Sequence, residues 1–178
     1  ENLMQKVVLV RHNSYLFKGT VEENLKMAKP DATKEEMEAV LQKVNLLGFL
    51  QTQDGLQTQL LEKASNLSGG QCQRLVIARA LLRTDSAVYI FDEAASNIDV
   101  ESEELIMNVI HELAKTKTVL LISHRLANVV KSDKIYFLKD GEIKESGKHD
   151  ELMSQNGAYR HLYESQMALE NYGKGGMA

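Results

Sequence analysis

The chain has 178 residues, of which 43% are hydrophobic and 26% charged, a balance typical of a globular domain rather than of a disordered chain. The formal net charge of −4 gives no electrostatic case for binding nucleic acid. A single cysteine, Cys72, excludes a disulfide within the chain and a zinc site built from cysteines alone. No apolar run approaches the roughly 20 residues that a membrane-spanning helix needs.

The first half of the chain predicts a strand followed by two helices. Residues 7–10, Val-Val-Leu-Val, form a short β-branched run that is typical of a buried strand. Within residues 31–47, Thr33 and Glu36 have the spacing of a capping box, and apolar residues then recur at helical intervals. A second helical pattern covers residues 71–83.

The second half alternates strands with helices. Strands are predicted at residues 87–91 and 118–123, with a helix at residues 100–114 between them. Residues 140–141, Asp-Gly, are a two-residue hairpin signal, and an amphipathic helix is predicted at residues 159–170. This order predicts an α/β fold with a parallel sheet, helices on both faces, and the hairpin as an antiparallel edge.

Residues 67–71, Leu-Ser-Gly-Gly-Gln, open one of these helices and have the features of a phosphate-binding site. Glycines let backbone N–H groups approach an anion, and a helix N-terminus adds unpaired donors and partial positive charge. The Ser68 hydroxyl can supply one more donor. The same residues are also typical of a plain helix that is capped by serine after a glycine turn.

A second group of polar residues follows the strand at residues 87–91. Asp92 and Glu93 come at its carboxyl end, where open α/β sheets bind ligands. Asp92 could orient Mg²⁺ through water, and Glu93 could act as general base on an attacking water. The alternative is that both carboxylates are merely solvated and that Asp99 only caps the next helix.

The strand at residues 118–123 leads directly to His124. An imidazole at this place could donate a hydrogen bond to a terminal phosphate and hold water in line for attack. A lone histidine at a strand end is more often structural, so His124 gains its meaning only together with the other two groups.

Taken in order, these groups form one composite pattern, and the chain resembles the nucleotide-binding domain of an ABC transporter from about residue 7 to residue 165. The matching motifs are Leu67–Gln71 for the signature sequence, Tyr89–Glu93 for the Walker B strand, Ser96–Asp99 for the D-loop and His124 for the switch histidine. Residues 15–24, Glu62 and residues 141–153 resemble the exporter type.

The resemblance implies a P-loop NTPase-like fold and ATP hydrolysis that drives transport, with ATP and Mg²⁺ as cofactors. Glu93 and His124 would be catalytic, and Asp92 would hold Mg²⁺ through water. A helical signature subdomain is expected at about residues 20–83 and the Walker B, D-loop and switch portion at about 84–170. Residues 171–178 would form a flexible tail.

The chain contains no G-x-x-x-x-G-K-[ST] sequence, which is the family's Walker A loop. The family places this loop and an adenine-stacking aromatic upstream of the strand at residues 7–10, so we expect the first part of the fold to be missing. In the family, two such domains pair head to tail, and each signature binds ATP held by the other. This role in trans would fall to Ser68, Gly69, Gly70 and Gln71, with Asp99 in the D-loop. The chain alone is expected to be inactive and to expose apolar surface through which it self-associates.

The sequence departs from the family pattern at two positions. His12 stands where a magnesium-contacting glutamine is usual, which puts a metal contact there in doubt because Mg²⁺ prefers oxygen ligands. A surface-loop histidine is the competing interpretation. Cys72 replaces a larger polar residue and is expected to be an inert thiol.

The resemblance implies a membrane domain of the same transporter as the other partner, no nucleic acid, and a location at the cytoplasmic face of the cell membrane. One alternative is a soluble ABC ATPase of nucleic-acid machinery, which would predict basic patches or coiled-coil insertions. Another is the non-catalytic half of a heterodimer, which the intact Glu93 disfavours.

Overall fold

The computed structural model describes residues 6–175 and, within them, the side chains of residues 6–170. The chain divides into two compact units, Glu1–Ile122 and Ser123–Ala178. The division falls directly after the last strand of the first unit, and each unit is described by itself.

The first unit is built on a three-stranded parallel sheet with the order β1-β4-β5. Its strands are β1 (Val7–Arg11), β4 (Val88–Asp92) and β5 (Thr118–Ile122). The register pairs Arg11 with Asp92 and Asp92 with Ile122, so the three strands end level with one another. Whatever follows these strands therefore gathers at one edge of the sheet.

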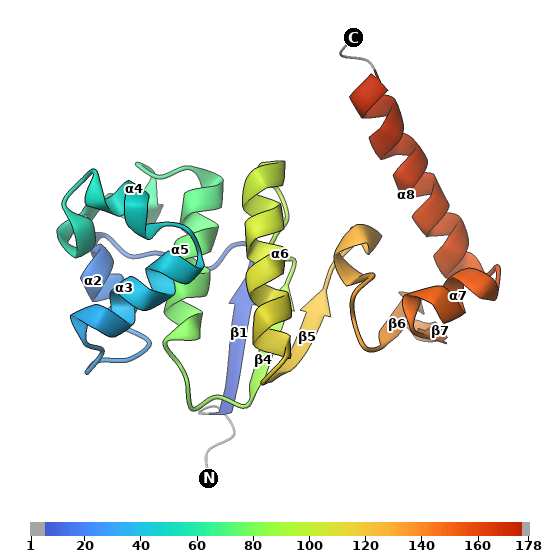
Figure 1. The fold of residues 1–178 in the computed structure, drawn as a ribbon, viewed down its shortest axis with the longest axis horizontal. Coiled ribbons are helices and arrows are strands. Elements are labelled where there is room, and N and C mark those ends of the chain that lie inside the picture. The colour runs from blue at the N-terminus through green and yellow to red at the C-terminus, as the bar shows by residue number, and fades with distance from the viewer. Residues whose placement is uncertain (1–5, 176–178) are drawn as a thin grey trace. The chain divides into compact units, whose positions relative to one another are not determined.

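Two helices, α5 (Gly69–Leu81) and α6 (Val100–Ala114), pack against this sheet (Figure 1). The strands alternate as a sheet with one covered face does: Val10 and Phe91 are buried, whereas Leu9, Leu120 and Ile122 are exposed. The α/β class with a parallel sheet and helices is confirmed. Among the described residues, the face of the sheet that carries Val10 and Phe91 is buried, whereas the face that carries Leu9 and Leu120 is exposed.

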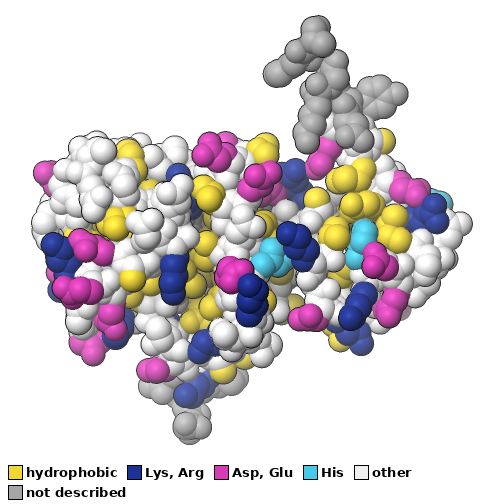
Figure 2. All heavy atoms as spheres, in the orientation of Figure 1, with side chains coloured by type: hydrophobic (Ala, Val, Ile, Leu, Met, Phe, Trp, Pro, Cys, Tyr) yellow, Lys and Arg dark blue, Asp and Glu magenta, His cyan; other side chains and the backbone are white. Residues whose placement is uncertain are grey.

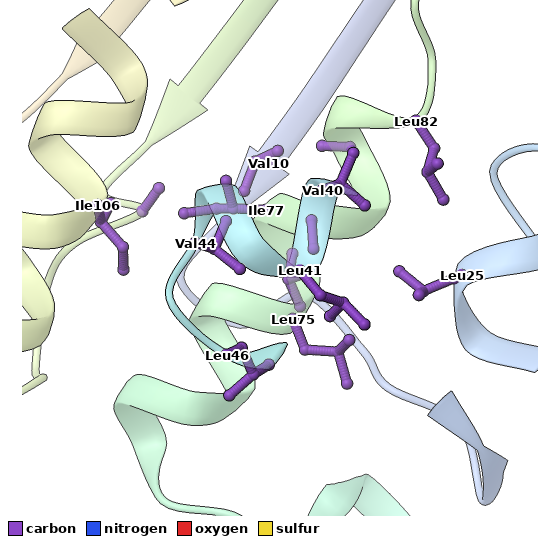
Figure 3. Packing of buried hydrophobic residues seen from close by; sticks show 14 of the residues in the cluster. Val10, Leu25, Val40, Leu41, Val44, Leu46, Leu75, Ile77, Leu82 and Ile106 are labelled. Atoms are coloured by element: carbon purple, nitrogen blue, oxygen red, sulfur yellow. The ribbon is translucent and has the colours of Figure 1, made fainter. Parts of the chain in front are cut away.

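Short elements between β1 and α5 complete the first unit. They are β2 (Gly19–Thr20), α2 (Val21–Lys26), α3 (Lys34–Lys43), α4 (Leu47–Gln51), η1 (Gly55–Gln57), β3 (Gln59–Leu60) and η2 (Glu62–Ala64). The predicted capping box of Thr33 and Glu36 starts α3. Leu25, Leu41 and Leu75 come from α2, α3 and α5 and meet in one apolar core, shown in Figure 3. Helix α5 thus packs against α2 and α3 as well as against the sheet.

The second unit contains η3 (Leu126–Val129), β6 (Ile135–Lys139), β7 (Glu142–Gly147), α7 (His149–Ser154) and α8 (Ala158–Gly175). The hairpin forms at Asp140 and Gly141, which both have positive φ angles, as its sequence predicts. It differs from expectation in being a two-stranded sheet of its own rather than an edge of the parallel sheet. Among the described residues, its strands pair with each other and with no third strand.

Helix α8 runs to Gly175, five residues past the predicted end at residue 170, so part of the predicted tail is helical. Residues 176–178 of that tail lie outside the described part of the chain. On the face shown in Figure 2, basic and acidic side chains are interspersed. Between residues 6 and 175, every helix is too short or too polar to cross a lipid bilayer.

Candidate functional site

The edge where β1, β4 and β5 end brings two of the predicted site residues together. The backbone N–H of His12 donates to the Asp92 carbonyl at 3.2 Å, so the residue after β1 is tied to the end of β4. The Asp92 carboxylate is partly exposed and lies 3.9 Å from Nε of Arg11, too far for a strong ion pair. Asp92 therefore presents a carboxylate with free capacity at the sheet edge.

Glu93 follows in a backbone conformation that is uncommon for a residue with a side chain. Its φ angle is 51°, in the left-handed region. The Glu93 N–H donates to the Ile122 carbonyl at 3.0 Å, and its own carbonyl accepts from the Ser96 hydroxyl at 2.8 Å. Such a conformation costs free energy and persists where its surroundings enforce it, often at functional sites. The turn aims Glu93 differently from a continued strand.

The start of α5 is closed by a reciprocal capping box. The Ser68 N–H donates to Oε1 of Gln71 at 2.9 Å, and the Gln71 N–H donates to the Ser68 hydroxyl at 3.2 Å. The Ser68 hydroxyl accepts in this bond and keeps its own proton to donate. Ser68 and Gly69 are exposed, so this helix start is accessible to an anion.

The two glycines of this helix start have different surroundings. A Cβ atom on Gly69 would meet its nearest neighbours, in Asn97 and Ile98, at 3.9 Å, which is ordinary contact. A Cβ atom on Gly70 would lie 2.8 Å from Cβ of Ser102 and 2.9 Å from Oδ2 of Asp99. Gly70 thus permits close packing of α5 on the start of α6, a role that the sequence alone did not indicate.

Asp99 caps α6, which is one of the two roles that the sequence offered for it. Its Oδ1 accepts from the Ser102 N–H at 2.8 Å. This hydrogen bond holds the pKa of the Asp99 carboxyl below its usual value. Through Gly70, Asp99 also lies beside the start of α5, so the two predicted segments 67–71 and 96–99 are neighbours within the first unit.

The loop between β1 and β2 is held by side chains that the sequence interpretation missed. Gln73 and Arg79, both on α5, donate to the carbonyls of Arg11 and Tyr15 at 3.3 and 3.0 Å. Gln73 is buried, and a polar residue at a buried position of an apolar helix face is the signal that could have revealed it. Two side chains of α5 therefore hold the loop that begins at His12 by hydrogen bonds to its backbone and to the residue before it.

An exposed aromatic pair lies at the far end of this loop. The rings of Tyr15 and Phe17 meet edge to face with centroids 4.8 Å apart, and both side chains are exposed. Buried Asn24 holds the base of the pair, because its amide accepts from the Phe17 N–H at 2.8 Å and donates to the Phe17 carbonyl at 2.9 Å. The loop thus presents two aromatic rings from a fixed backbone.

His124 belongs to the second unit, where it is exposed. The residues before and after His124 are joined in a tight turn. The Ser123 hydroxyl accepts from the Arg125 N–H at 3.0 Å and donates to the Arg125 carbonyl at 3.1 Å. The backbone that carries the imidazole is therefore fixed locally.

The comparison with known proteins decides the family. Residues 1–96 match the family model of the ABC transporter. The chain belongs to the ABC transporter family. This confirms the resemblance read from the signature, Walker B, D-loop and switch motifs.

The relatives of this ABC chain include exporters. It is 54% identical, over 93% of its length, to an uncharacterized ABC transporter ATP-binding protein of Haemophilus influenzae, of which it covers 30%. It is 42% identical over 93% of its length to the ATP-dependent lipid A-core flippase of Vibrio vulnificus, and covers 29% of it. The structure of a bacterial Atm1-family ABC exporter with ATP bound shares 29% identity and a TM-score of 0.83, over 91% of this chain and 28% of that one. The chain thus spans about 30% of the length of these relatives.

The ABC family implies Mg²⁺ with the nucleotide, and the donor set can be tested against that ion. Between residues 6 and 170, no three His, Cys, Asp or Glu side chains are close enough to form a metal cage. Asp92 offers a partly exposed carboxylate at the sheet edge, and this suits an ion that keeps much of its water and takes phosphate oxygens as ligands. His12 is exposed, and its place beside Asp92 is shown through the backbone only.

Cys72, the other departure from the family pattern, lies on α5. It is half-buried, and its Sγ contacts the Ala64 carbonyl at 3.6 Å. Burial raises the pKa of the Cys72 thiol, which lowers its thiolate fraction at neutral pH. This environment agrees with the expectation of an inert thiol.

Proposed function

We propose that this chain is the Walker B, signature and switch portion of an ATPase that drives an ABC exporter. The observation that carries the proposal is the sheet edge: Glu93 follows Asp92 at the end of the central strand, in a left-handed turn tied to β5. Carboxyl ends of parallel strands are where α/β folds bind ligands. The exporter relatives support transport as the process that hydrolysis would drive.

In this proposal the two carboxylates have separate roles. Asp92 would hold Mg²⁺ through water, and the ion, when bound, would supply positive charge beside the phosphates. Glu93 accepts a proton from the attacking water as general base, and its backbone is held at the end of β4 by the hydrogen bond to Ile122. His124 donates a hydrogen bond to the γ-phosphate, where charge develops in the transition state.

The start of α5 serves a nucleotide held elsewhere. Because the chain contains no Walker A sequence, we infer that Ser68, Gly69, Gly70 and Gln71 bind ATP that a second nucleotide-binding domain cradles. The exposed Ser68 hydroxyl and the accessible helix N-terminus suit the terminal phosphate. This arrangement requires head-to-tail pairing of the two domains, with Asp99 near their interface.

The exposed pair Tyr15 and Phe17 is the proposed contact to a membrane domain of the same transporter, at the cytoplasmic face of the membrane. Because α5 grips this loop through Gln73 and Arg79, movement of the signature helix would reach the aromatic pair. A second candidate, the non-catalytic half of a heterodimer, is favoured by one observation, the replacement of the usual glutamine by His12.

The test uses a chimera in which this chain replaces the matching segment of the Haemophilus influenzae relative. We expect the chimera to hydrolyse ATP and Glu93→Gln to lower kcat by about 100-fold or more, with the affinity for ATP little changed. Glu104→Gln, on the exposed side of α6, is the matched control and should leave kcat unchanged. Undiminished hydrolysis by Glu93→Gln would reject the general-base role, whereas a chimera that binds ATP without hydrolysing it would favour the non-catalytic alternative.

A further inference from the structure

One side chain of α8, that of Gln166, forms hydrogen bonds to the backbone of His124 and of Leu126, on either side of Arg125. Nε2 of Gln166 donates to the His124 carbonyl at 2.8 Å, and Oε1 of Gln166 accepts from the Leu126 N–H at 2.9 Å. A carboxamide is the neutral side-chain group that offers a donor and an acceptor side by side, and here both are used on the backbone.

A second contact lies one turn further along α8 (Glu170 follows Gln166 by four residues). Glu170 accepts from Nη2 of Arg125 at 2.9 Å. Side chains of α8 therefore hold the segment from His124 to Leu126. The two hydrogen bonds between the Ser123 hydroxyl and the Arg125 backbone fix the start of this segment locally. Leu126 is buried, which anchors the end of the segment.

Helix α8 itself is docked independently of Gln166. Near its start, Tyr159 is fully buried, and the Glu145 carboxylate accepts from the Ala158 N–H at 2.6 Å and from the Tyr159 N–H at 3.3 Å. Loss of the Gln166 carboxamide should therefore leave the first turns of the helix in place. The contacts at Gln166 and Glu170 serve the segment that carries His124 more than they serve the helix.

We propose that Gln166, supported by Glu170, is a positioning residue that holds the His124 backbone, so that α8 sets the reach of the switch imidazole. The proposal rests on the role of His124 in the proposed function. The position of the backbone at residue 124 limits where the imidazole can reach, and a displacement of about 1 Å in a catalytic group can cost about 100-fold in rate. Nothing in the motif pattern of the family's nucleotide site points to residue 166, which lies 42 residues beyond His124.

The first arm of the test measures the hydrogen bonds in the 178-residue chain. Gln166→Met keeps the length of the side chain and removes both bonds, so amide hydrogen exchange at Leu126 should accelerate about fivefold. Gln166→Glu keeps the acceptor for Leu126 and loses the donor to His124, so its exchange at Leu126 should stay near that of the wild type. Glu164→Gln breaks only the Arg160–Glu164 pair on the same helix and should change nothing at Leu126. Unchanged exchange at Leu126 in Gln166→Met would overturn the proposal.

The second arm measures ATP hydrolysis in the chimera with the Haemophilus influenzae relative. Gln166→Met should lower kcat about tenfold with KM for ATP within twofold of wild type, whereas Glu164→Gln should match wild type in both. In a His124→Ala background, Gln166→Met should have no further effect, because it acts through that imidazole. A loss in kcat that adds to that of His124→Ala would overturn the positioning role.

The two arms separate this proposal from the one on which it rests. If His124→Ala leaves kcat unchanged, the catalytic role of His124 fails and the positioning role fails with it, whatever exchange at Leu126 shows. If His124→Ala lowers kcat while Gln166→Met leaves kcat unchanged, only the role of Gln166 is rejected.

Discussion

At the scale of single residues, the two glycines of the signature illustrate how one motif can combine two physical tasks. Gly69 is exposed and has room for a side chain, so its value lies in the approach of a ligand to its backbone. Gly70 is buried and faces Asp99 and Ser102, so its value lies in packing. A sequence motif cannot separate these tasks, because both require the absence of the same Cβ atom.

This difference makes a prediction for the pair of alanine variants. Gly70→Ala should lower the free energy of unfolding by about 1–3 kcal/mol, because the new methyl group would press on the Ser102 side chain and shift α5 from α6. Gly69→Ala should be neutral or slightly stabilising, since alanine is favoured over glycine within a helix. Urea denaturation, with comparison of midpoints at equal slope, measures both. Equal stability of the two variants would contradict the packing role of Gly70.

At the scale of elements, α6 shows how a cap links a helix to its surroundings. Asp99 accepts from the Ser102 N–H and so satisfies one of the unpaired donors at the start of α6. The same side chain lies against Gly70 of α5. The ionised carboxylate therefore supports both the helix and the place where α5 and α6 meet.

A pH dependence follows from this cap. Because the hydrogen bond from Ser102 lowers the folded-state pKa of Asp99 below its usual 3.8, the carboxylate stabilises the fold above that value. Its contribution is lost as the pH falls through the lowered folded-state pKa. We expect Asp99→Ala to lower Tm at pH 7 and to lose most of this difference near pH 2. Thermal melts followed by circular dichroism, with Glu104→Ala as the control on α6, measure the effect; a difference that is the same at both pH values would argue against it.

At the scale of the whole molecule, the structure consists of two units whose boundary lies between Ile122 and Ser123. The first unit carries Asp92, Glu93 and the signature, and the second carries His124 with its support on α8. The predicted boundaries at residues 20–83 and 84–170 follow the family's motifs instead and stay a prediction.

The absence of a Walker A sequence makes a prediction for the 178-residue chain. It should bind ATP more weakly than about 1 mM, because Walker A supplies the backbone donors and lysine that hold the phosphates. Isothermal titration calorimetry with MgATP measures this, and the chimera with the Haemophilus influenzae relative is the positive control. Micromolar affinity of the chain itself would show that its own residues suffice and would remove the need for a site in trans.

Local features were predictable from the sequence because their contacts span only a few residues. The capping box of Thr33, the serine cap at Ser68, the strand predicted at residues 87–91 and found at 88–92, and the helix at residues 100–114 depend on side-chain periodicity and on hydrogen bonds three residues apart. The order of the motifs was enough to identify the family. The roles of Glu93, His124 and the signature residues came with that identification and stay proposals.

Only the tertiary structure decided which distant groups meet. Three of these contacts join residues between 29 and 62 positions apart. Gly70 packs against Asp99 and Ser102, Gln73 donates a hydrogen bond to the Arg11 carbonyl, and Gln166 donates one to the His124 carbonyl. Such pairs depend on how the helices dock against sheet and loop, which the burial of apolar surface drives without regard to sequence distance. A polar side chain that serves a remote backbone group therefore carries no local signal beyond its presence on a helix face.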